Sequence, residues 1–366
     1  MSDQIVPILM PKWGLSMRVG TLAVWHVEEG TDISPGDEIM DVETDKIANA
    51  VEAADGGLLR RCVGRAGEVY PVRALLGVMA PSSVSDAEVD AYVAAFEMPE
   101  VEDDEDTGPS YEFAELEIGK IRYTERSGDG VPVVLIHGFG GDLDNWLFNI
   151  DALAEKAPVY ALDLPGHGQS VKAVANPNLE TMVSAVIQLM DHLRIEKAHL
   201  VGHSMGGLVA AQTGISNPKR VASLSLICSA GLGDEINAEY IDGFVFAANR
   251  KELKPKLKHL FADESLVNRS MVDDLLKYKR LDGVQTFLEA LKDNMFGNGK
   301  QAVNVIAGLE ALECSQQVIW GEADAVIPKT HANGITGATV TVVPGAGHMV
   351  QMEESSLVNE CLKELL

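Results

Sequence analysis

Several features typical of common protein classes are absent from this sequence. No apolar run approaches the ~18 residues that can span a membrane, and the opening residues MSDQIVPILMPKWG place no basic segment before an apolar one, as a secretory signal would. The four cysteines have no C-x-x-C spacing, so we expect free, buried thiols in a reducing compartment; they are Cys62, Cys228, Cys314 and Cys361. Together these absences predict a cytoplasmic protein without a membrane partner.

Positive charge is also scarce. The chain has 29 Lys and Arg residues against 55 Asp and Glu residues, a formal net charge of −26. A protein that binds nucleic acid needs a basic surface to meet the phosphates, so a nucleic-acid partner is not expected. The imbalance is greatest in residues 81–110, which contain ten acidic residues and no basic one.

The length of 366 residues suggests about two domains. Within residues 1–80 the segments that begin at Gly20 and Gly57 resemble each other, with Gly30 matching Gly67 in the same register. Short apolar runs separated by Gly and Pro predict strands and turns in both halves. We therefore expect two similar all-β halves that pack face to face as a small sandwich or flattened barrel.

Between the two halves, apolar and polar residues partly alternate on both sides of Lys46, which predicts a hairpin with Lys46 at its tip. From composition alone this would be an ordinary surface lysine. The segment ETDKIA at residues 43–48, together with the glycine repeat, resembles the lipoyl domains of 2-oxoacid dehydrogenase acyltransferases. That resemblance implies that Lys46 carries lipoate in amide linkage.

Residues 81–110 are expected to join two domains. Ser85 can cap a short helix whose apolar positions include Val89 and Val93. The acidic run that follows cannot bury apolar surface, and its like charges repel one another, so we expect an extended, flexible linker.

From residue 111 onward the pattern changes to alternating strands and helices. Continuous apolar runs predict buried strands at Val131–Ile136, Val159–Leu162, His199–Val201, Ser223–Ile227, Val318–Trp320 and Val340–Val343. Helical stretches such as Leu179–Leu193 separate them. This alternation predicts a mainly parallel sheet covered by helices on both faces.

Candidate catalytic residues follow these strands. The sequence GHSMG places Ser204 between a strand and a helix, where a sharp turn would expose a nucleophile. Asp324 and His348 follow the last two strands, in the chain order expected for a serine, acid and histidine triad. Asp324 could instead cap a helix ahead of Pro328, in which case Glu322 is the alternative acid.

The segment HGFGGD after the first buried strand predicts an oxyanion loop. The backbone N–H groups of Phe139 and Met205 would then face the developing negative charge. His137, His167 and His203 are expected to be structural.

Residues 111–366 resemble the α/β-hydrolase superfamily, with a helical cap at about residues 232–300. In this cap, Arg250, Lys251, Lys254, Lys256 and Lys258 are opposed locally only by Glu252. We expect them to steer the phosphates of coenzyme A or the acidic first domain; the alternative is a solvated helix face.

A lipoyl domain joined to this fold resembles the acyltransferase components of acetoin dehydrogenase complexes. The resemblance implies transfer of acetyl from S-acetyl-dihydrolipoyl-Lys46 to coenzyme A, with subunits of a thiamine-diphosphate-dependent acetoin dehydrogenase, dihydrolipoamide dehydrogenase and a homo-oligomer as partners. The usual H-x-x-x-D signature of lipoyl acyltransferases is absent from the C-terminus. A thioesterase or esterase that carries a lipoyl domain, and a non-catalytic scaffold, are the alternatives.

Overall fold

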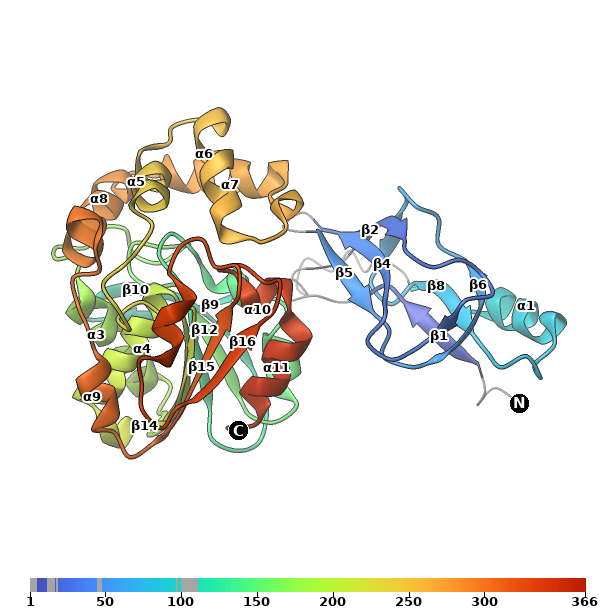
Figure 1. Cartoon of the computed structure of the whole chain (residues 1–366), viewed down its shortest axis with the longest axis horizontal. Coiled ribbons are helices and arrows are strands. Elements are labelled where there is room, and N and C mark those ends of the chain that lie inside the picture. The colour runs from blue at the N-terminus through green and yellow to red at the C-terminus, as the bar shows by residue number, and fades with distance from the viewer. Residues whose placement is uncertain (1–4, 12–16, 18, 45–47, 97, 100–110) are drawn as a thin grey trace. The chain divides into compact units, whose positions relative to one another are not determined.

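A computed structural model describes residues 5–11, 17, 19–44, 48–96, 98–99 and 111–366, without the side chain of residue 298. The chain separates into two compact units, Met1–Gly108 and Pro109–Leu366. Figure 1 shows both units.

The first unit consists of two four-stranded antiparallel sheets. One sheet has the order β1 (Val6–Leu9), β8 (Leu75–Met79), β6 (Gly57–Cys62), β3 (Asp32–Ile33). The other has the order β5 (Ala48–Glu52), β4 (Glu38–Glu43), β2 (Val19–Trp25), β7 (Val69–Pro71). Fully buried side chains from both sheets form the core; they include Leu22, Met40, Val42, Leu59 and Leu76. The predicted all-β fold is confirmed.

The internal repeat has a clear structural meaning. An offset of 37 residues brings the bounds of β2 onto those of β6, and those of β4 onto those of β8, to within one residue. Gly30 and Gly67 occupy equivalent turns with φ angles of 93° and 84°, which favour glycine. The two halves nevertheless do not form one sheet each, because β3 pairs with β6 and β7 pairs with β2. Strand exchange therefore joins the two halves.

The expected hairpin is present on both sides of Lys46. Strands β4 and β5 pair in antiparallel register, and Glu43 lies opposite Ala48 at the end of the ladder. Lys46 itself lies outside the described residues.

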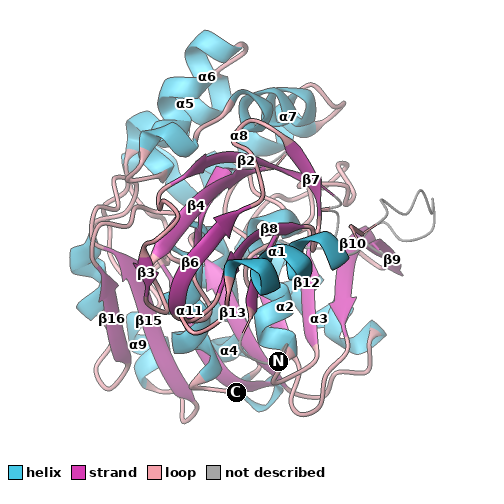
Figure 2. Cartoon of the chain, turned by 90° about the vertical axis from the view of Figure 1, so that its right-hand side faces the viewer, coloured by secondary structure: helices cyan, strands magenta, loops and turns pink. Residues whose placement is uncertain are grey.

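The helix expected at Ser85 is α1 (Asp86–Ala95), and it begins with a capping box between Ser85 and Glu88. It packs on β6 and β8 of the first unit (Figure 2), where Val89 is fully buried. Arg60 also donates to Asp86 at 2.7 Å. This helix, which the sequence assigned to the linker region, is thus part of the first compact unit.

An eight-stranded sheet forms the centre of the second unit. Its order is β16 (Thr339–Val343), β15 (Ser315–Gly321), β14 (Val221–Ile227), β13 (Ala198–His203), β11 (Val133–Ile136), β12 (Val159–Leu162), β10 (Gly119–Arg126), β9 (Tyr111–Leu116). All six predicted strands are present and run parallel to one another. The expected burial is wrong for the last of them, because β16 is an edge strand in which Val342 is exposed. The antiparallel strands β10 and β9 come last in this order, with β9 at the edge, and were not predicted individually.

Helices cover this sheet on both faces, as predicted. α2 (Ile150–Ala154) and α11 (Ser355–Lys363) pack together, whereas α3 (Leu179–His192) and α9 (Ile306–Glu310) pack on α4 (Met205–Ser216). The short helix α10 (Val350–Glu353) precedes α11. Single 3-10 turns are η2 (Leu143–Trp146), η3 (Pro218–Arg220), η4 (Lys258–Leu260), η5 (Glu264–Leu266), η6 (Gly297–Gly299) and η7 (Lys329–Asn333).

The insertion between β14 and β15 forms the expected helical cap. It contains α5 (Ala238–Phe246), α6 (Arg250–Leu257), α7 (Arg269–Lys279) and α8 (Val284–Phe296), which lie together beyond one end of the sheet (Figure 1). The cap contacts the loop after β12, where Tyr278 Oη donates to the carbonyl oxygen of Gly166 at 2.9 Å.

Within the described residues, none of the helices combines the length and apolar character needed to cross a bilayer. All four cysteines are free thiols, as expected. Cys228 is fully buried, but Cys62, Cys314 and Cys361 are only partly buried, which corrects the expectation for these three.

Candidate active site

Ser204 lies in a strained turn between β13 and α4. Its backbone has φ 55° and ψ −120°, a conformation that is unfavourable for a residue with a side chain. Two hydrogen bonds hold the turn against the end of β14: the N–H of Ser204 donates to Ile227 at 2.9 Å, and its carbonyl oxygen accepts from Ala230 at 3.0 Å. Such strain, enforced by the surrounding backbone, is typical of an exposed nucleophile.

The glycines around Ser204 are required by close backbone contacts. A Cβ atom at Gly202 would lie 2.2 Å from the carbonyl oxygen of Gly206. A Cβ atom at Gly206 would lie 2.2 Å from the carbonyl oxygen of Ile136. The spacing G-x-S-x-G therefore lets the first turn of α4 pack directly against the strand ends.

Asp324 is the buried acid of the site. One carboxylate oxygen, Oδ2, lies 2.8 Å from His348 Nδ1, and the other, Oδ1, accepts from the N–H groups of Val326 and Ile327 at 2.8 and 2.9 Å. Burial alone would raise the pKa of Asp324, but the charge of His348 and these hydrogen bonds outweigh it and lower the pKa. Asp324 therefore caps the following turn and also orients His348, so the two readings of the sequence are compatible.

His348 is held from several sides. Its side chain is 2% exposed, and its ring packs on that of His203 with 4.8 Å between the centroids. His203 Nε2 donates to the carbonyl oxygen of His348 at 2.9 Å. Because burial lowers the pKa of His203 to about 3, this imidazole is neutral at physiological pH. These contacts agree with the structural role expected for His203.

The hydroxyl of Ser204 forms no hydrogen bond with His348 within the described residues, so only two members of the expected triad are directly joined. Ser204 nevertheless directly follows His203, which contacts His348 through both its ring and Nε2. The link from Ser204 to His348 thus remains a prediction that this neighbourhood supports.

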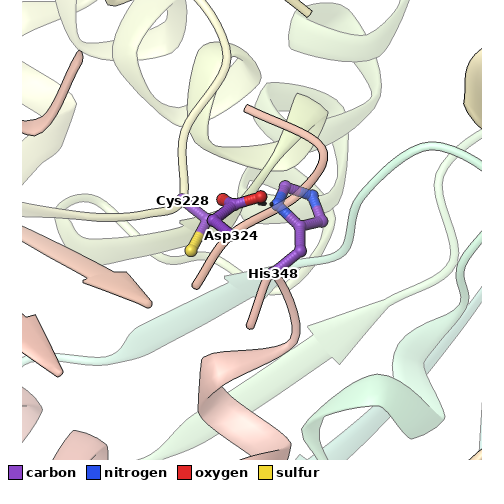
Figure 3. Close-up of side chains that lie close together, drawn as sticks. All are labelled: Cys228, Asp324 and His348. Atoms are coloured by element: carbon purple, nitrogen blue, oxygen red, sulfur yellow. Dashed lines mark hydrogen bonds and ion pairs between the residues drawn. The ribbon is translucent and has the colours of Figure 1, made fainter. Parts of the chain in front are cut away.

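Cys228 is a further member of the site that sequence analysis did not single out (Figure 3). Its Sγ, the carboxylate of Asp324 and a ring nitrogen of His348 lie within 4.8 Å of one another. Burial raises the pKa of Cys228 well above its usual value, and the charge of Asp324 raises it further, so the thiol stays protonated. Its φ of 42° is a second strained position, directly after β14.

These three side chains also have donor atoms that a metal ion can bind. An ion lies about 2 Å from nitrogen and oxygen ligands. His348 Nδ1 and Asp324 Oδ2 lie 2.8 Å apart, the distance of a direct N–H···O hydrogen bond, so each of these two atoms already has a partner. The arrangement fits a histidine–carboxylate pair rather than a metal centre.

The expected oxyanion loop follows β11 and lies against Ser204. A Cβ atom at Gly138 would lie 3.1 Å from Ser204 Cβ, so the backbone that leads into Phe139 passes close to the nucleophile. Met205 is the first residue of α4, where backbone N–H groups lack an acceptor within the helix. Both predicted oxyanion donors therefore adjoin Ser204.

Aromatic side chains of the cap cover this loop. The ring of Phe139 makes edge contacts with Phe244 of α5 and Phe296 of α8, with centroids 5.9 and 5.8 Å apart. A Cβ atom at Gly140 would lie 2.3 Å from the ring of Phe244. These contacts join the cap to the oxyanion loop through apolar surfaces that exclude water.

His137 and His167 occupy the buried structural positions expected for them. His137 accepts from the N–H of Leu164 at 3.0 Å, and its ring contacts that of His167 with 4.9 Å between the centroids. Burial lowers the pKa of His137 to about 4 and that of His167 well below its usual value. Both rings are therefore neutral and connect the oxyanion loop to the loop after β12.

The basic cluster of the cap is less exposed to partners than its sequence suggests. Three of its five cations form ion pairs: Arg250 with Asp273 of α7, Lys256 with Glu239 of α5 at 2.7 Å, and Lys258 with Glu264 of η5 at 2.5 Å. The expectation that only Glu252 opposes the cluster is thus wrong, because acids from other elements of the cap lie beside it. Lys251 and Lys254 pair with no acid in the described part of the chain.

Glu322, the alternative acid, does not contact His348. It is half exposed and pairs with Lys329 at 3.1 Å. Asp324, and not Glu322, is therefore the acid whose carboxylate lies beside His348.

Two protein families match this chain. Residues 131–355 match the alpha/beta hydrolase fold family, and residues 6–77 match the family of biotin-requiring enzymes, which covers biotin and lipoyl attachment domains. The chain therefore belongs to the α/β-hydrolase fold family and carries an attachment domain at its N-terminus.

Full-length relatives identify the family more closely. The chain is 52% identical to the dihydrolipoyllysine-residue acetyltransferase component of the acetoin cleaving system of Cupriavidus necator, over 100% of this chain and 98% of that one. It is 48% identical to the component of the same name from Pseudomonas putida, over 98% and 97% of the two chains. The chain thus belongs to the family of these acetyltransferase components.

The second unit also resembles hydrolases. It is similar to the 2-hydroxymuconate semialdehyde hydrolase of Pseudomonas sp., with 31% identity over 65% of this chain and 89% of that one. The structure of the meta-cleavage product hydrolase from Pseudomonas fluorescens matches with a TM-score of 0.63 and 25% identity, over 69% of this chain and 96% of that one. These likenesses agree with the fold described above.

Proposed function

We propose that this chain transfers an acetyl group from a thioester on its lipoyl arm at Lys46 to coenzyme A, as part of an acetoin cleaving system. Ser204 is the nucleophile, His348 the base and Asp324 the residue that orients the base. The observation that carries this proposal is the buried His348–Asp324 pair beside a strained serine. The full-length relatives with the same two domains support the substrate assignment.

The first unit fits a lipoyl attachment site at Lys46. Strands β4 and β5 are paired up to Glu43 and Ala48, and Lys46 falls between these two residues in the sequence. Lipoate bound there would supply the thiol that carries the acetyl group.

The acylation step uses the geometry around Ser204. His348 takes the proton of the Ser204 hydroxyl as its oxygen attacks the thioester carbon, and the buried carboxylate of Asp324 stabilises the imidazolium that forms. The N–H groups of Phe139 and Met205 stabilise the tetrahedral oxyanion. The C–S bond then breaks, and His348 returns the proton to the departing thiolate, which leaves acetyl-Ser204.

Deacylation reverses these bond changes, with the thiol of coenzyme A in place of the lipoyl thiol. His348 takes the proton of the coenzyme A thiol, whose sulfur attacks acetyl-Ser204 and forms acetyl-coenzyme A. The serine oxygen leaves and regains its proton from His348. Since water is the competing acceptor, the aromatic contacts between the cap and the oxyanion loop favour transfer by limiting access of water.

The remaining partners follow from the same assignment. A thiamine-diphosphate-dependent acetoin dehydrogenase would load the acetyl group, and a dihydrolipoamide dehydrogenase would reoxidise the arm. Cytoplasmic location and a homo-oligomeric state belong to this proposal as well.

Lys251 and Lys254 are the cap residues most available to the coenzyme A phosphates. Arg250 and Lys256, which the sequence also suggested, already have acidic partners on neighbouring helices. Reversing the charge of Lys251 and Lys254 together should raise the KM for coenzyme A, whereas an unchanged KM would exclude this role.

A hydrolase is the second candidate, because the second unit is 31% identical to a 2-hydroxymuconate semialdehyde hydrolase over 89% of that chain. Water and a thiol can use the same serine, histidine and acid. The hydrolase reading predicts acetate as the product, whether or not coenzyme A is present.

One experiment separates these readings. The lipoylated full chain is incubated with S-acetyl-dihydrolipoamide, with and without coenzyme A, and both acetyl-coenzyme A and acetate are measured. We expect acetyl-coenzyme A as the main product, its loss in Ser204→Ala, and an acetylated Ser204 peptide after a rapid acid quench. Unchanged transfer by Ser204→Ala would rule out the serine mechanism. Mass spectrometry of the same sample tests lipoate on Lys46.

A further inference from the structure

The loop that carries His348 is attached to the cap on both sides of the histidine. On one side, the N–H of Met349 donates to the carbonyl oxygen of Leu260 at 2.9 Å. On the other side, the N–H of Gly347 donates to Glu353 Oε2 at 2.7 Å. Leu260 belongs to the cap segment between α6 and α7, whereas Glu353 ends the short helix α10.

The second oxygen of Glu353 binds the same cap segment. Oε1 accepts from the N–H of Ala262 at 2.6 Å and from that of Asp263 at 3.4 Å. The carboxylate thus has one oxygen on the histidine loop and the other on the cap. Charge-assisted hydrogen bonds of this kind are stronger than neutral ones, and they fix both backbones at once.

The two backbones also touch directly. A Cβ atom at Gly347 would lie 2.6 Å from the backbone nitrogen of Ala262 and 2.8 Å from the carbonyl carbon of Phe261. Only a glycine at this position lets the cap approach so closely. Burial raises the pKa of Glu353, and the hydrogen bonds from Gly347, Ala262 and Asp263 offset part of that rise.

We infer that Glu353 is a positioning residue that couples the closed cap to the orientation of His348. Displacement of the cap segment Leu260–Asp263 would pull on both neighbours of His348 through these contacts. The histidine is then best placed for proton transfer only when the cap excludes water. This inference rests on the proposed function and adds a reason why acetyl-Ser204 is passed to a thiol rather than to water.

The test compares Glu353→Gln with Glu360→Gln in the lipoylated full chain. Glu353→Gln keeps the shape but replaces one acceptor oxygen by an NH2 group, which faces a backbone N–H. Glu360 is exposed on the following helix α11 and provides the matched change of charge. The measurements are kcat and KM for acetyl transfer, the ratio of acetate to acetyl-coenzyme A, and hydrogen exchange at Gly347, Met349 and Ala262.

For Glu353→Gln we expect a kcat about tenfold lower, an acetate share several-fold higher and faster exchange at the three amides. Glu360→Gln should match the wild type in all of them. Simple loss of folded protein would lower the apparent kcat but leave the product ratio unchanged. A Glu353→Gln protein with wild-type product ratio and exchange would overturn the inference.

A failure of the proposed function gives a different result. If the wild-type chain makes no acetyl-coenzyme A, the transferase assignment fails whatever the variants do. Glu353 is then tested by turnover of p-nitrophenyl acetate, which reports acylation and deacylation of Ser204 without coenzyme A. Turnover and amide exchange both unchanged in Glu353→Gln would exclude coupling in that case too.

Discussion

Replacing Asp324 by Asn tests the contact between Asp324 and His348, because the surrounding hydrogen-bond donors determine the orientation of the new side-chain amide. The two oxygens of Asp324 have different partners: Oδ1 accepts from two backbone N–H groups, of Val326 and Ile327, and Oδ2 faces His348 Nδ1. An asparagine has only one oxygen, so it can satisfy one side only.

The backbone donors decide the orientation. With the amide oxygen toward Val326 and Ile327, the NH2 group faces His348 Nδ1 and requires that nitrogen to be unprotonated. The proton of the ring then sits on Nε2, which can no longer accept the proton of Ser204. The opposite orientation restores the active tautomer but leaves two buried N–H groups facing an NH2 group.

The difference in free energy between the two orientations determines how much activity is lost. Each buried donor without a partner costs about 1–3 kcal/mol, so two cost about 2–6 kcal/mol. Since ~1.4 kcal/mol corresponds to a factor of ten, the population of the active tautomer falls by roughly 10³-fold. The span of 2–6 kcal/mol extends this factor by about one to one and a half orders of magnitude in either direction. We expect kcat of Asp324→Asn to fall by that factor, with little change in KM because Asp324 does not touch substrate in this scheme.

The assay is acetyl transfer from S-acetyl-dihydrolipoamide to coenzyme A under saturating conditions. Glu322→Gln is the matched control, since Glu322 lies two residues away, is half exposed and pairs only with Lys329 among the described residues. It should retain nearly full activity. An Asp324→Asn protein within threefold of the wild type, or an equal loss in Glu322→Gln, would exclude this role of Asp324.

Three other predictions concern the scaffold of the site. Gly202→Ala would put Cβ 2.2 Å from a backbone carbonyl oxygen of α4, so we expect ~1–3 kcal/mol lower stability and at least 100-fold lower kcat, measured by urea unfolding and acetyl transfer. Cys228→Ser keeps a donor near the buried carboxylate and should stay within about threefold of wild-type kcat, whereas Cys228→Ala should lose about fivefold; equal rates would show that the Cys228 thiol does not support Asp324. Burial holds the pKa of His137 at about 4, that of His203 at about 3 and that of His167 well below its usual value. The unfolded chain binds these protons below pH ~6.5, whereas the folded chain keeps the rings neutral. The free energy of unfolding should therefore be highest above that pH and fall below it, by up to about 1.4 kcal/mol per pH unit for each ring. Urea unfolding at pH 7.5, 6.5 and 5.5 should show this slope, and equal free energies at the three pH values would contradict it.

Local sequence was sufficient for the two folds. The 37-residue repeat placed equivalent turns at Gly30 and Gly67, because a left-handed turn favours glycine wherever it occurs. Five of the six apolar runs became buried parallel strands because only a covered sheet can bury such residues on both faces, and the sixth, β16, is the edge strand. Local sequence did not indicate that β3 and β7 exchange sheets, since strands of two and three residues have almost no pattern of their own.

The sequence also supplied the members of the site but not all of their contacts. Ser204, Asp324 and His348 stand out because each follows a strand, and carboxyl ends of parallel strands share one edge of the sheet. Cys228 gave no such signal, because a lone cysteine after a strand looks like any buried thiol. Its place beside Asp324 depends on how β14 and β15 pair.

Electrostatic contacts depended most on the tertiary structure. The turns, most of the buried segments and the order of the catalytic groups could be predicted, because they follow from the conformations and hydropathy of neighbouring residues. The pairing of Asp273 with Arg250, and the link that Glu353 forms between the histidine loop and the cap, become visible only in the folded chain. A charge interacts with whatever lies within a few ångströms of it, and in a folded chain those neighbours come from segments far away in sequence.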